Sequence, residues 1–180
     1  MKFLKALFSL GLLVMTFGCS SQVIKADFDH GEDFSTFQEF EWAKKPASQA
    51  SSRSPLAAHK NLYEKRLKDS IQNYLKKQNI VLATPATGKV DFKIASHFNV
   101  GGKINVKDWN YKYRGRYKNP NLRNEKHLEE TLVIDFIDIE SNELIWRGWA
   151  TETVDHNPKK SEKKMKESVE KILSQFPPKK

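Results

Sequence analysis

The stretch from residue 132 to residue 154, LVIDFIDIESNELIWRGWATETV, decides how this chain folds. Residues 132–139 are apolar at nearly every position, as expected of a central strand that is covered on both faces. Residues 140–143 read as a short turn, and residues 144–154 return as the hairpin partner, with Trp146 and Trp149 on opposite faces. The stretch therefore predicts the middle of an antiparallel sheet.

Two further strands are predicted on the N-terminal side of this hairpin. In residues 34–42, Phe34, Phe40 and Trp42 share one parity, with Phe37 out of phase, after a turn around residues 31–35. Residues 90–100 alternate more clearly, which predicts a half-buried strand, and the alternation resumes at residues 104–106 after a glycine bend. The apolar members of this second strand are Val90, Phe92, Ile94, Phe98 and Val100.

Two amphipathic helices complete the predicted fold. Residues 44–59 have no periodicity and read as a mobile loop, and the first helix follows them. The second helix begins near Asn157 and Pro158 and ends before Pro177. We expect an α+β fold in the order β-α-β-β-β-α, with a mostly antiparallel sheet of about four to five strands and two helices packed on one face. The apolar stripes are Leu56, Tyr63, Leu67, Ile71, Tyr74 and Leu75 in the first helix, and Met165, Val169, Ile172, Leu173 and Phe176 in the second.

The N-terminus, residues 1–18, reads as an export signal. Lys2 and Lys5 form a positive head, and residues 6–17 are apolar except for Ser9, Gly11 and Thr16. A permanent membrane span needs about 20 apolar residues. We therefore expect this segment to be removed after export.

Cys19 is the only cysteine of the chain and stands at the predicted cleavage point. With Gly18 before it and Ser20 after it, the site resembles the lipobox of bacterial lipoproteins, in which the thiol carries diacylglycerol and the freed amine a third acyl chain. In such lipoproteins the residue after the cysteine resembles a sorting label, and a serine, as at Ser20, permits passage to the outer membrane. We expect a lipidated Cys19, a tether over residues 19–26 and a single periplasmic domain over residues 27–180; the alternative is a secreted protein with a chance cysteine.

The charge of the chain is basic, and much of it lies in one segment. Without residues 1–18, which hold two of the 31 basic and none of the 22 acidic residues, the net charge is +7. An exported basic chain meets anionic lipid, lipopolysaccharide and peptidoglycan, so we expect no nucleic-acid partner. Residues 103–127 contain eight basic residues against Asp108 and Glu125.

In this basic segment aromatic residues of one parity interleave with cations of the other. An extended ribbon with an aromatic face and a cationic face suits an anionic lipid or lipopolysaccharide, because cations meet phosphate and aromatics sit at the headgroup level. The alternatives are a solvated hairpin whose aromatics pack on the core, and contact with peptidoglycan or an envelope protein. The candidate binding residues are Lys103, Lys107, Trp109, Tyr111, Lys112, Tyr113, Arg114, Arg116, Tyr117 and Lys118.

The carboxylates and histidines do not form a catalytic or metal-binding pattern. Asp27, Asp29 and Asp33 have the spacing of a calcium loop, but Glu32 stands where that loop needs glycine and Gln38 where it needs glutamate, so a turn is favoured. Asp135 and Asp138 should point to opposite faces of their strand, with Asp135 held by Arg147 on the partner strand. The histidines at positions 30, 59, 97, 127 and 156 lack metal-ligand spacing. We predict no catalytic residue, metal or cofactor; an envelope hydrolase is the alternative function.

An ordered set of short motifs resembles the bacterial lipoprotein family known as domain of unknown function 4136. The resemblance implies a small α+β envelope domain, usually lipid-anchored, with no assigned reaction and no known catalytic residues. Members often carry a stretch rich in Gly and Trp before the Leu-Val-Ile-Asp strand, whereas residues 103–127 are basic here. The motifs are Asp33-Phe34-Ser35 with Phe37, Phe40 and Trp42; Leu132-Val133-Ile134-Asp135 with Asp138; Leu144-Ile145-Trp146-Arg147-Gly148 with Ala150; and Val169, Lys171-Ile172-Leu173 and Phe176-Pro177-Pro178-Lys179.

Overall fold

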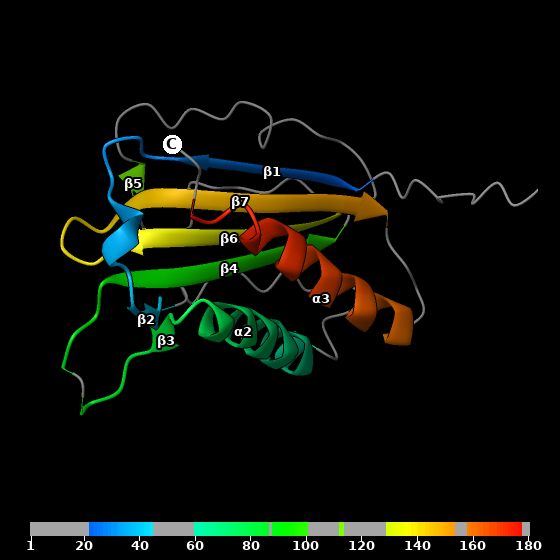
Figure 1. Ribbon diagram of the computed structural model, residues 1–180. Helices are drawn as coiled ribbons and strands as arrows, with labels where there is room; N and C mark the ends of the chain where they lie inside the picture. Colours follow the sequence, from blue (N-terminus) through cyan, green and yellow to red (C-terminus); the bar gives the residue numbers. More distant parts are fainter. Residues whose placement is uncertain are drawn as a thin grey trace, which may run out of the picture.

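The computed structural model describes residues 22–44, 60–86, 88–100, 112–113, 129–153 and 158–177. These residues form one β-sheet with two helices, α2 (Lys60–Lys77) and α3 (Pro158–Leu173), packed on one of its faces (Figure 1). The predicted α+β class and the placement of both helices on one face are confirmed.

The sheet is mixed and has seven strands, in the order β1-β7-β6-β4-β2-β3, with β5 also paired to β7. The long strands pair antiparallel, whereas the short pairs β2–β4, β2–β3 and β5–β7 are parallel. The prediction of four to five mostly antiparallel strands was therefore wrong in number and in part of the pairing. The bounds are β1 (Val23–Phe28), β2 (Glu39–Trp42), β3 (Val81–Leu82), β4 (Phe92–Val100), β5 (Lys112–Tyr113), β6 (Glu129–Asp138) and β7 (Glu143–Thr153).

Two physical reasons explain the missed strands. β3 and β5 have two residues each, too few for any alternation to be read from the sequence. β2 and β4 are parallel because the chain between them runs through α2, and a crossover helix returns the chain to the same end of the sheet.

The first strand, β1, begins inside the segment that we expected to be a tether. It pairs with β7 from Val23 to Phe28, so the predicted tether over residues 19–26 is wrong from Val23 onward. Ile24, Ala26 and Phe28 pack against the core, while Val23 and Lys25 are exposed. This half-buried pattern is typical of an edge strand, and its row of only three core-facing residues made it weak in the sequence.

The segment 34–42 is a 3₁₀ turn followed by a strand rather than one strand. The 3₁₀ helix η1 (Phe34–Thr36) precedes β2, and Asp33 caps it by accepting a hydrogen bond from the Ser35 N–H. A 3₁₀ helix has three residues per turn, so Phe34 and Phe37 face the same side and both are buried. This geometry explains why Phe37 was out of phase with a period of two.

The central hairpin is formed as predicted by β6 and β7. Residues 132–137 are all buried, and Trp146 and Trp149 lie on opposite faces of the sheet. Between the pairs Phe136–Trp146 and Ile137–Leu144 the register shifts, which leaves Ile145 as an extra residue in β7. The strand that the sequence marked as covered on both faces is therefore the centre of the fold.

The helix-side face of this hairpin carries an aromatic core. The Phe136 ring lies 4.7 Å from the ring of Phe92, 4.8 Å from that of Trp146 and 4.7 Å from that of Phe176. Gly148 is required beside them, because a Cβ there would collide with the Trp146 indole and with Ile172 of α3. The glycine lets α3 approach the sheet closely.

The two helices lie side by side and run in the same direction over the sheet (Figure 1). The apolar residues predicted for them are confirmed as core, except that Tyr63 and Tyr74 are half-buried against it and Leu56 lies outside the described residues. Among the residues described, neither helix is both long and apolar enough to cross a membrane. The buried apolar residues of the helices are Leu67, Ile71 and Leu75 in α2, and Met165, Val169, Ile172 and Leu173 in α3.

Candidate functional site

The predicted lipidation site and nearly all of the predicted basic ribbon lie outside the described residues. Only Lys112 and Tyr113 of the ribbon are described, as β5, which pairs in parallel with Glu143 and Leu144 of β7. Their backbone is extended. Outside the described residues are Cys19, Lys103, Lys107, Trp109, Tyr111, Arg114, Arg116, Tyr117 and Lys118.

On the sheet face away from the helices, a buried ion pair occupies the centre. Arg147 of β7 and Asp135 of β6 are direct cross-strand partners, as predicted. The guanidinium donates two hydrogen bonds, from Nε to Asp135 Oδ1 at 2.5 Å and from Nη2 to Asp135 Oδ2 at 2.6 Å. Both residues are buried, at 2% and 0% exposure. A bidentate pair of this kind fixes the register of the two central strands.

His97 of β4 joins this pair from the next strand. Its Nε2 lies 3.7 Å from Asp135 Oδ2, which is beyond hydrogen-bond distance but close enough for an ion pair when the ring is protonated. The β4–β6 register pairs Ala95 with Asp135, so His97 is the diagonal neighbour of Asp135 on the same face. The sequence indicated a polar face on this strand but not the register that brings His97 to Asp135.

The geometry of these charges is that of a structural pair. Both oxygens of Asp135 accept hydrogen bonds from Arg147, which neutralises the carboxylate inside the protein. Asp138 is on the other face of β6, as predicted, and its Oδ1 accepts hydrogen bonds from the Ser141 backbone N–H at 2.7 Å and from the Ser141 hydroxyl. The two carboxylates therefore do not converge on a substrate.

After β1 ends at Phe28, the chain forms a turn between Asp29 and Asp33. Asp29 Oδ1 accepts a hydrogen bond from the Gly31 N–H at 2.9 Å, and Asp33 Oδ1 accepts one from the Ser35 N–H at 3.1 Å. These are Asx turns, which confirm the turn predicted for this segment. Across the described ranges, no group of three or more His, Cys, Asp or Glu residues is placed to hold a metal ion.

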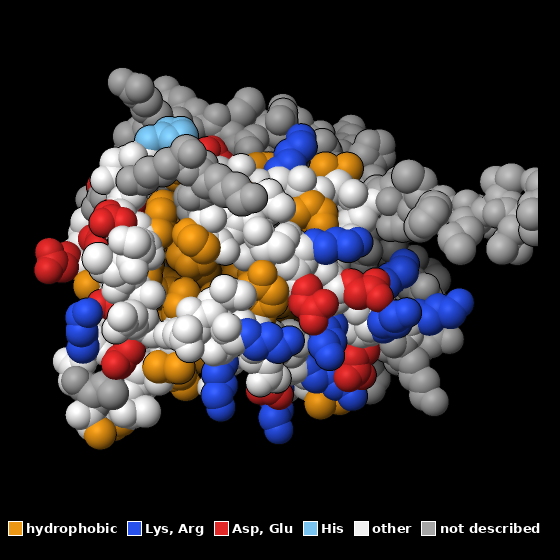
Figure 2. Space-filling model, in the orientation of Figure 1, with side chains coloured by type: hydrophobic (Ala, Val, Ile, Leu, Met, Phe, Trp, Pro, Cys, Tyr) orange, Lys and Arg blue, Asp and Glu red, His pale blue; other side chains and the backbone are white. Residues whose placement is uncertain are grey.

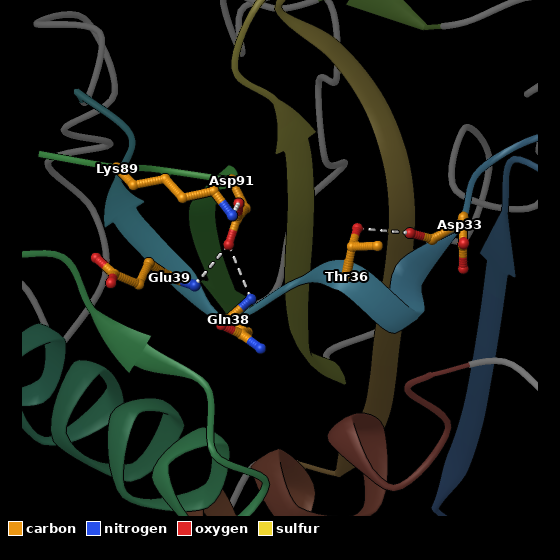
Figure 3. A network of polar contacts seen from close by, with 6 residues as sticks. All are labelled: Asp33, Thr36, Gln38, Glu39, Lys89 and Asp91. Carbon is orange, nitrogen blue, oxygen red and sulfur yellow. Dashed lines mark hydrogen bonds and ion pairs between the residues drawn. The ribbon is translucent and has the colours of Figure 1, made fainter. Parts of the chain in front are cut away.

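Asp91 organises the polar network at the start of β2 and β4 (Figure 3). Its Oδ2 accepts hydrogen bonds from the backbone N–H groups of Gln38 and Glu39, both at 2.9 Å. Its Oδ1 forms an ion pair with Lys89 Nζ at 2.8 Å. One carboxylate thus satisfies two backbone donors at the beginning of β2 and ties the two parallel strands together. No sequence pattern had marked Asp91.

The pKa of Asp91 is lowered by this arrangement. Burial, the largest single effect, raises the pKa, but the hydrogen bonds from Lys89, Gln38 and Glu39 and the positive charge of Lys89 together outweigh it. A carboxyl whose pKa is lower in the folded state stabilises the fold at pH values above the unfolded-state pKa of about 3.9. That stabilisation is lost as the pH falls through the folded-state pKa.

We therefore expect Asp91→Ala to lower the free energy of unfolding at neutral pH by about 1–3 kcal/mol, because two backbone donors lose their acceptor. Asp91→Asn is the matched control, since its amide oxygen can still accept from both donors. Urea unfolding should show a smaller loss for the Asn variant, and its difference from wild type should shrink as the pH falls below about 4. A difference that is independent of pH would contradict the assigned role of the charge.

Gln22, directly before β1, forms hydrogen bonds to α3. Its Nε2 donates a hydrogen bond to Ser168 Oγ at 2.6 Å, and its Oε1 accepts one from Lys171 Nζ at 2.6 Å. Gln22 is the third residue after Cys19 in the sequence. The first described residue after Cys19 is thus bonded to the lysine-rich helix α3.

With the geometry described, comparison with known proteins places the chain in a family. The model of the family described as "Domain of unknown function (DUF4136)" matches residues 24–178. The chain belongs to the DUF4136 family. The match begins in β1 and ends after α3, so the DUF4136 domain includes the sheet and both helices. It also includes the first strand, which we had expected to lie mostly in the tether.

Two solved structures are similar to this chain at low sequence identity. A PDZ domain protein from Parabacteroides distasonis has a TM-score of 0.55 and 16% identity over 88% of this chain, which spans only 37% of that protein. The PelC dodecamer from Paraburkholderia phytofirmans has a TM-score of 0.44 and 13% identity, covering 85% of this chain and 96% of that one. No curated protein matches the chain. At these identities the likeness of the first structure to this DUF4136 domain concerns the fold alone.

Proposed function

We propose that this DUF4136 protein is a lipoprotein anchored through Cys19 to the periplasmic face of the outer membrane, and that it acts by contact rather than by catalysis. The support for the anchor is the export signal at residues 1–18, the single cysteine behind it and Ser20 at the sorting position. Several acyl chains on one residue would make a lasting anchor, because each buried methylene contributes about 0.8 kcal/mol.

The observation that carries the proposal is the short distance along the chain between Cys19 and the folded domain. Gln22 is already bonded to α3, and Val23 begins the sheet. Three residues of extended chain span at most about 10 Å. A lipid on Cys19 would therefore hold the domain close to the membrane surface, without a long linker between them.

The partner that the domain contacts is proposed from its charge. The basic segment, residues 103–127, suits anionic lipid or lipopolysaccharide, because aromatic residues interleave there with the cations Lys112, Arg114, Arg116 and Lys118. Peptidoglycan and an envelope protein complex are the other partners that fit an exported basic domain. The buried Asp135–Arg147 pair favours contact over hydrolysis, because its carboxylate is bound by a guanidinium rather than directed at a substrate.

The anchor predicts where the protein is found after cell fractionation. Wild type should sediment with the outer membrane, whereas Cys19→Ala should lose the anchor and sediment with the membranes much less. Ser20→Asp is the matched control, because it keeps Cys19 and should move the protein to the inner membrane. Recovery of the Cys19→Ala variant in the outer membrane at the wild-type level would contradict a lipid anchor at Cys19.

A further inference from the structure

β1 lies at one edge of the sheet (Figure 1). It pairs with β7 on one side, and in the part of the chain that the structure describes no strand pairs with its other side. Val23, at 47% exposure, and Lys25 are exposed, and Figure 2 shows hydrophobic and basic side chains on the surface at the position of β1. An edge of this kind offers backbone N–H and C=O groups to another strand.

The backbone groups on this outer edge belong to alternate residues. The Asp29 N–H donates to a carbonyl of β7 at 2.8 Å. Groups on an antiparallel strand alternate between its two sides, so Ile24, Ala26 and Phe28 direct theirs away from β7. The Phe28 N–H agrees with this, because it donates to Asp27 Oδ1 at 3.0 Å. For the outward groups of Ile24 and Ala26 the described residues provide no partner.

The charges of β1 suit a second copy of the same strand. In an antiparallel pair with the two Ala26 residues opposite each other, Lys25 of each copy lies opposite Asp27 of the other, on the same face. A register with Phe28 opposite itself would place Asp27 opposite Asp29 of the second copy. The shift in the other direction would leave Lys25 without a carboxylate opposite it. Charge complementarity therefore selects the register centred on Ala26.

The other face of the same pairing is apolar. Ile24 of one copy would lie opposite Phe28 of the second copy, and both residues pack against the core in each chain. The small side chain of Ala26 at the centre lets the two strands approach. When Asp27 turns to Lys25 of the second copy, the Phe28 N–H is released and can donate to the opposite Ile24 carbonyl.

We infer that β1 joins two copies of this chain into a symmetric dimer with one continuous sheet. The contact is isologous, because each copy contributes the same strand, and the helices of both copies lie on the same face of the joined sheet. A pairing of six residues on each side is short, so the dimer should be weak and its population should depend on protein concentration. The inference does not depend on the proposed lipid at Cys19.

The test is sedimentation equilibrium of the full chain carrying Cys19→Ala, which excludes a disulfide and a lipid as the cause of association. This chain should dimerise reversibly over a concentration series. Lys25→Glu should raise the dissociation constant about tenfold or more, because symmetry turns two attractions into two repulsions. Lys65→Glu, at an exposed lysine of α2, makes the same change of charge and should leave the dissociation constant unchanged.

A rescue experiment separates pairing of the charges from their individual effects. Asp27→Lys alone should also weaken the dimer, but an equimolar mixture of the Lys25→Glu and Asp27→Lys chains should form a heterodimer in which opposite charges face each other again. Asp27→Asn keeps an acceptor for the Phe28 N–H; added to Lys25→Glu, it removes the repulsion and should recover part of the lost affinity.

Three outcomes would overturn the inference. The first is a chain that stays monomeric throughout the concentration series. The second is an equal loss of affinity with Lys25→Glu and Lys65→Glu, and the third is no recovery when Asp27→Asn is added to Lys25→Glu.

Discussion

Replacing Arg147 by Met is expected to lower the free energy of unfolding by about 3–5 kcal/mol. The substitution keeps much of the side-chain volume but removes both guanidinium donors from Asp135, which is fully buried. A charge left in the protein interior without its partner costs far more than the pair contributes when both members are present. The measurement is urea unfolding followed by tryptophan fluorescence at neutral pH.

Two variants serve as controls for the Arg147 prediction. Arg66→Met removes an exposed guanidinium that pairs with Glu162 at 2.8 Å, and it should cost less than about 1 kcal/mol. Replacing both members of the buried pair, Asp135→Leu with Arg147→Met, should recover most of the lost stability, because no charge is left behind. A double variant as unstable as Arg147→Met alone would contradict this explanation and point to lost packing instead.

Trp146→Ala should be the most damaging change on the helix-side face, with a loss of about 3–5 kcal/mol. The indole is fully buried, contacts the rings of Phe136 and Phe176, and lies in the space that Gly148 leaves open. Its removal would leave a cavity between β7 and α3 that neighbouring side chains cannot fill. Thermal and urea unfolding should both report the loss.

Trp146→Phe separates the volume of the indole from its polar group. The indole N–H is buried and has no hydrogen-bond partner among the residues that the structure describes, which carries a desolvation cost of about 1–3 kcal/mol. Phenylalanine removes that unsatisfied donor, so it should cost much less than alanine. Leu62→Ala, at a side chain with 47% exposure, should change stability by less than about 0.5 kcal/mol. Equal losses for the Phe and Ala variants would contradict the view that ring volume dominates at this position.

The strong periodic signals of the sequence were sufficient for the centre of the fold. The unbroken apolar run of β6, the alternation of β4 and the apolar stripe of α3 each specify one solution, because a shifted register would expose a whole row of core residues. The short elements could not be predicted from the sequence. β3 and β5 have two residues each, and η1 replaced an expected strand because its period of three imitates a broken alternation.

The residues of the candidate site also differ in whether the sequence could predict them. The Asp135–Arg147 pair followed from parity on two strands joined by a short turn, so local reasoning reached it. His97 and Asp91 depend on which residues of distant strands stand opposite each other, and the sequence contains no signal for that register. The bonds of Gln22 to α3 likewise join distant parts of the chain, and only the structure reveals them.

The central claim is that Cys19 carries a lipid that holds this domain at the membrane. The most direct test is growth of the producing bacterium with radiolabelled palmitate, followed by isolation of wild type and of Cys19→Ala. The account predicts label on the wild-type protein and none on the variant, since the chain has no other cysteine. An unlabelled wild-type protein, or equal label on both, would contradict it.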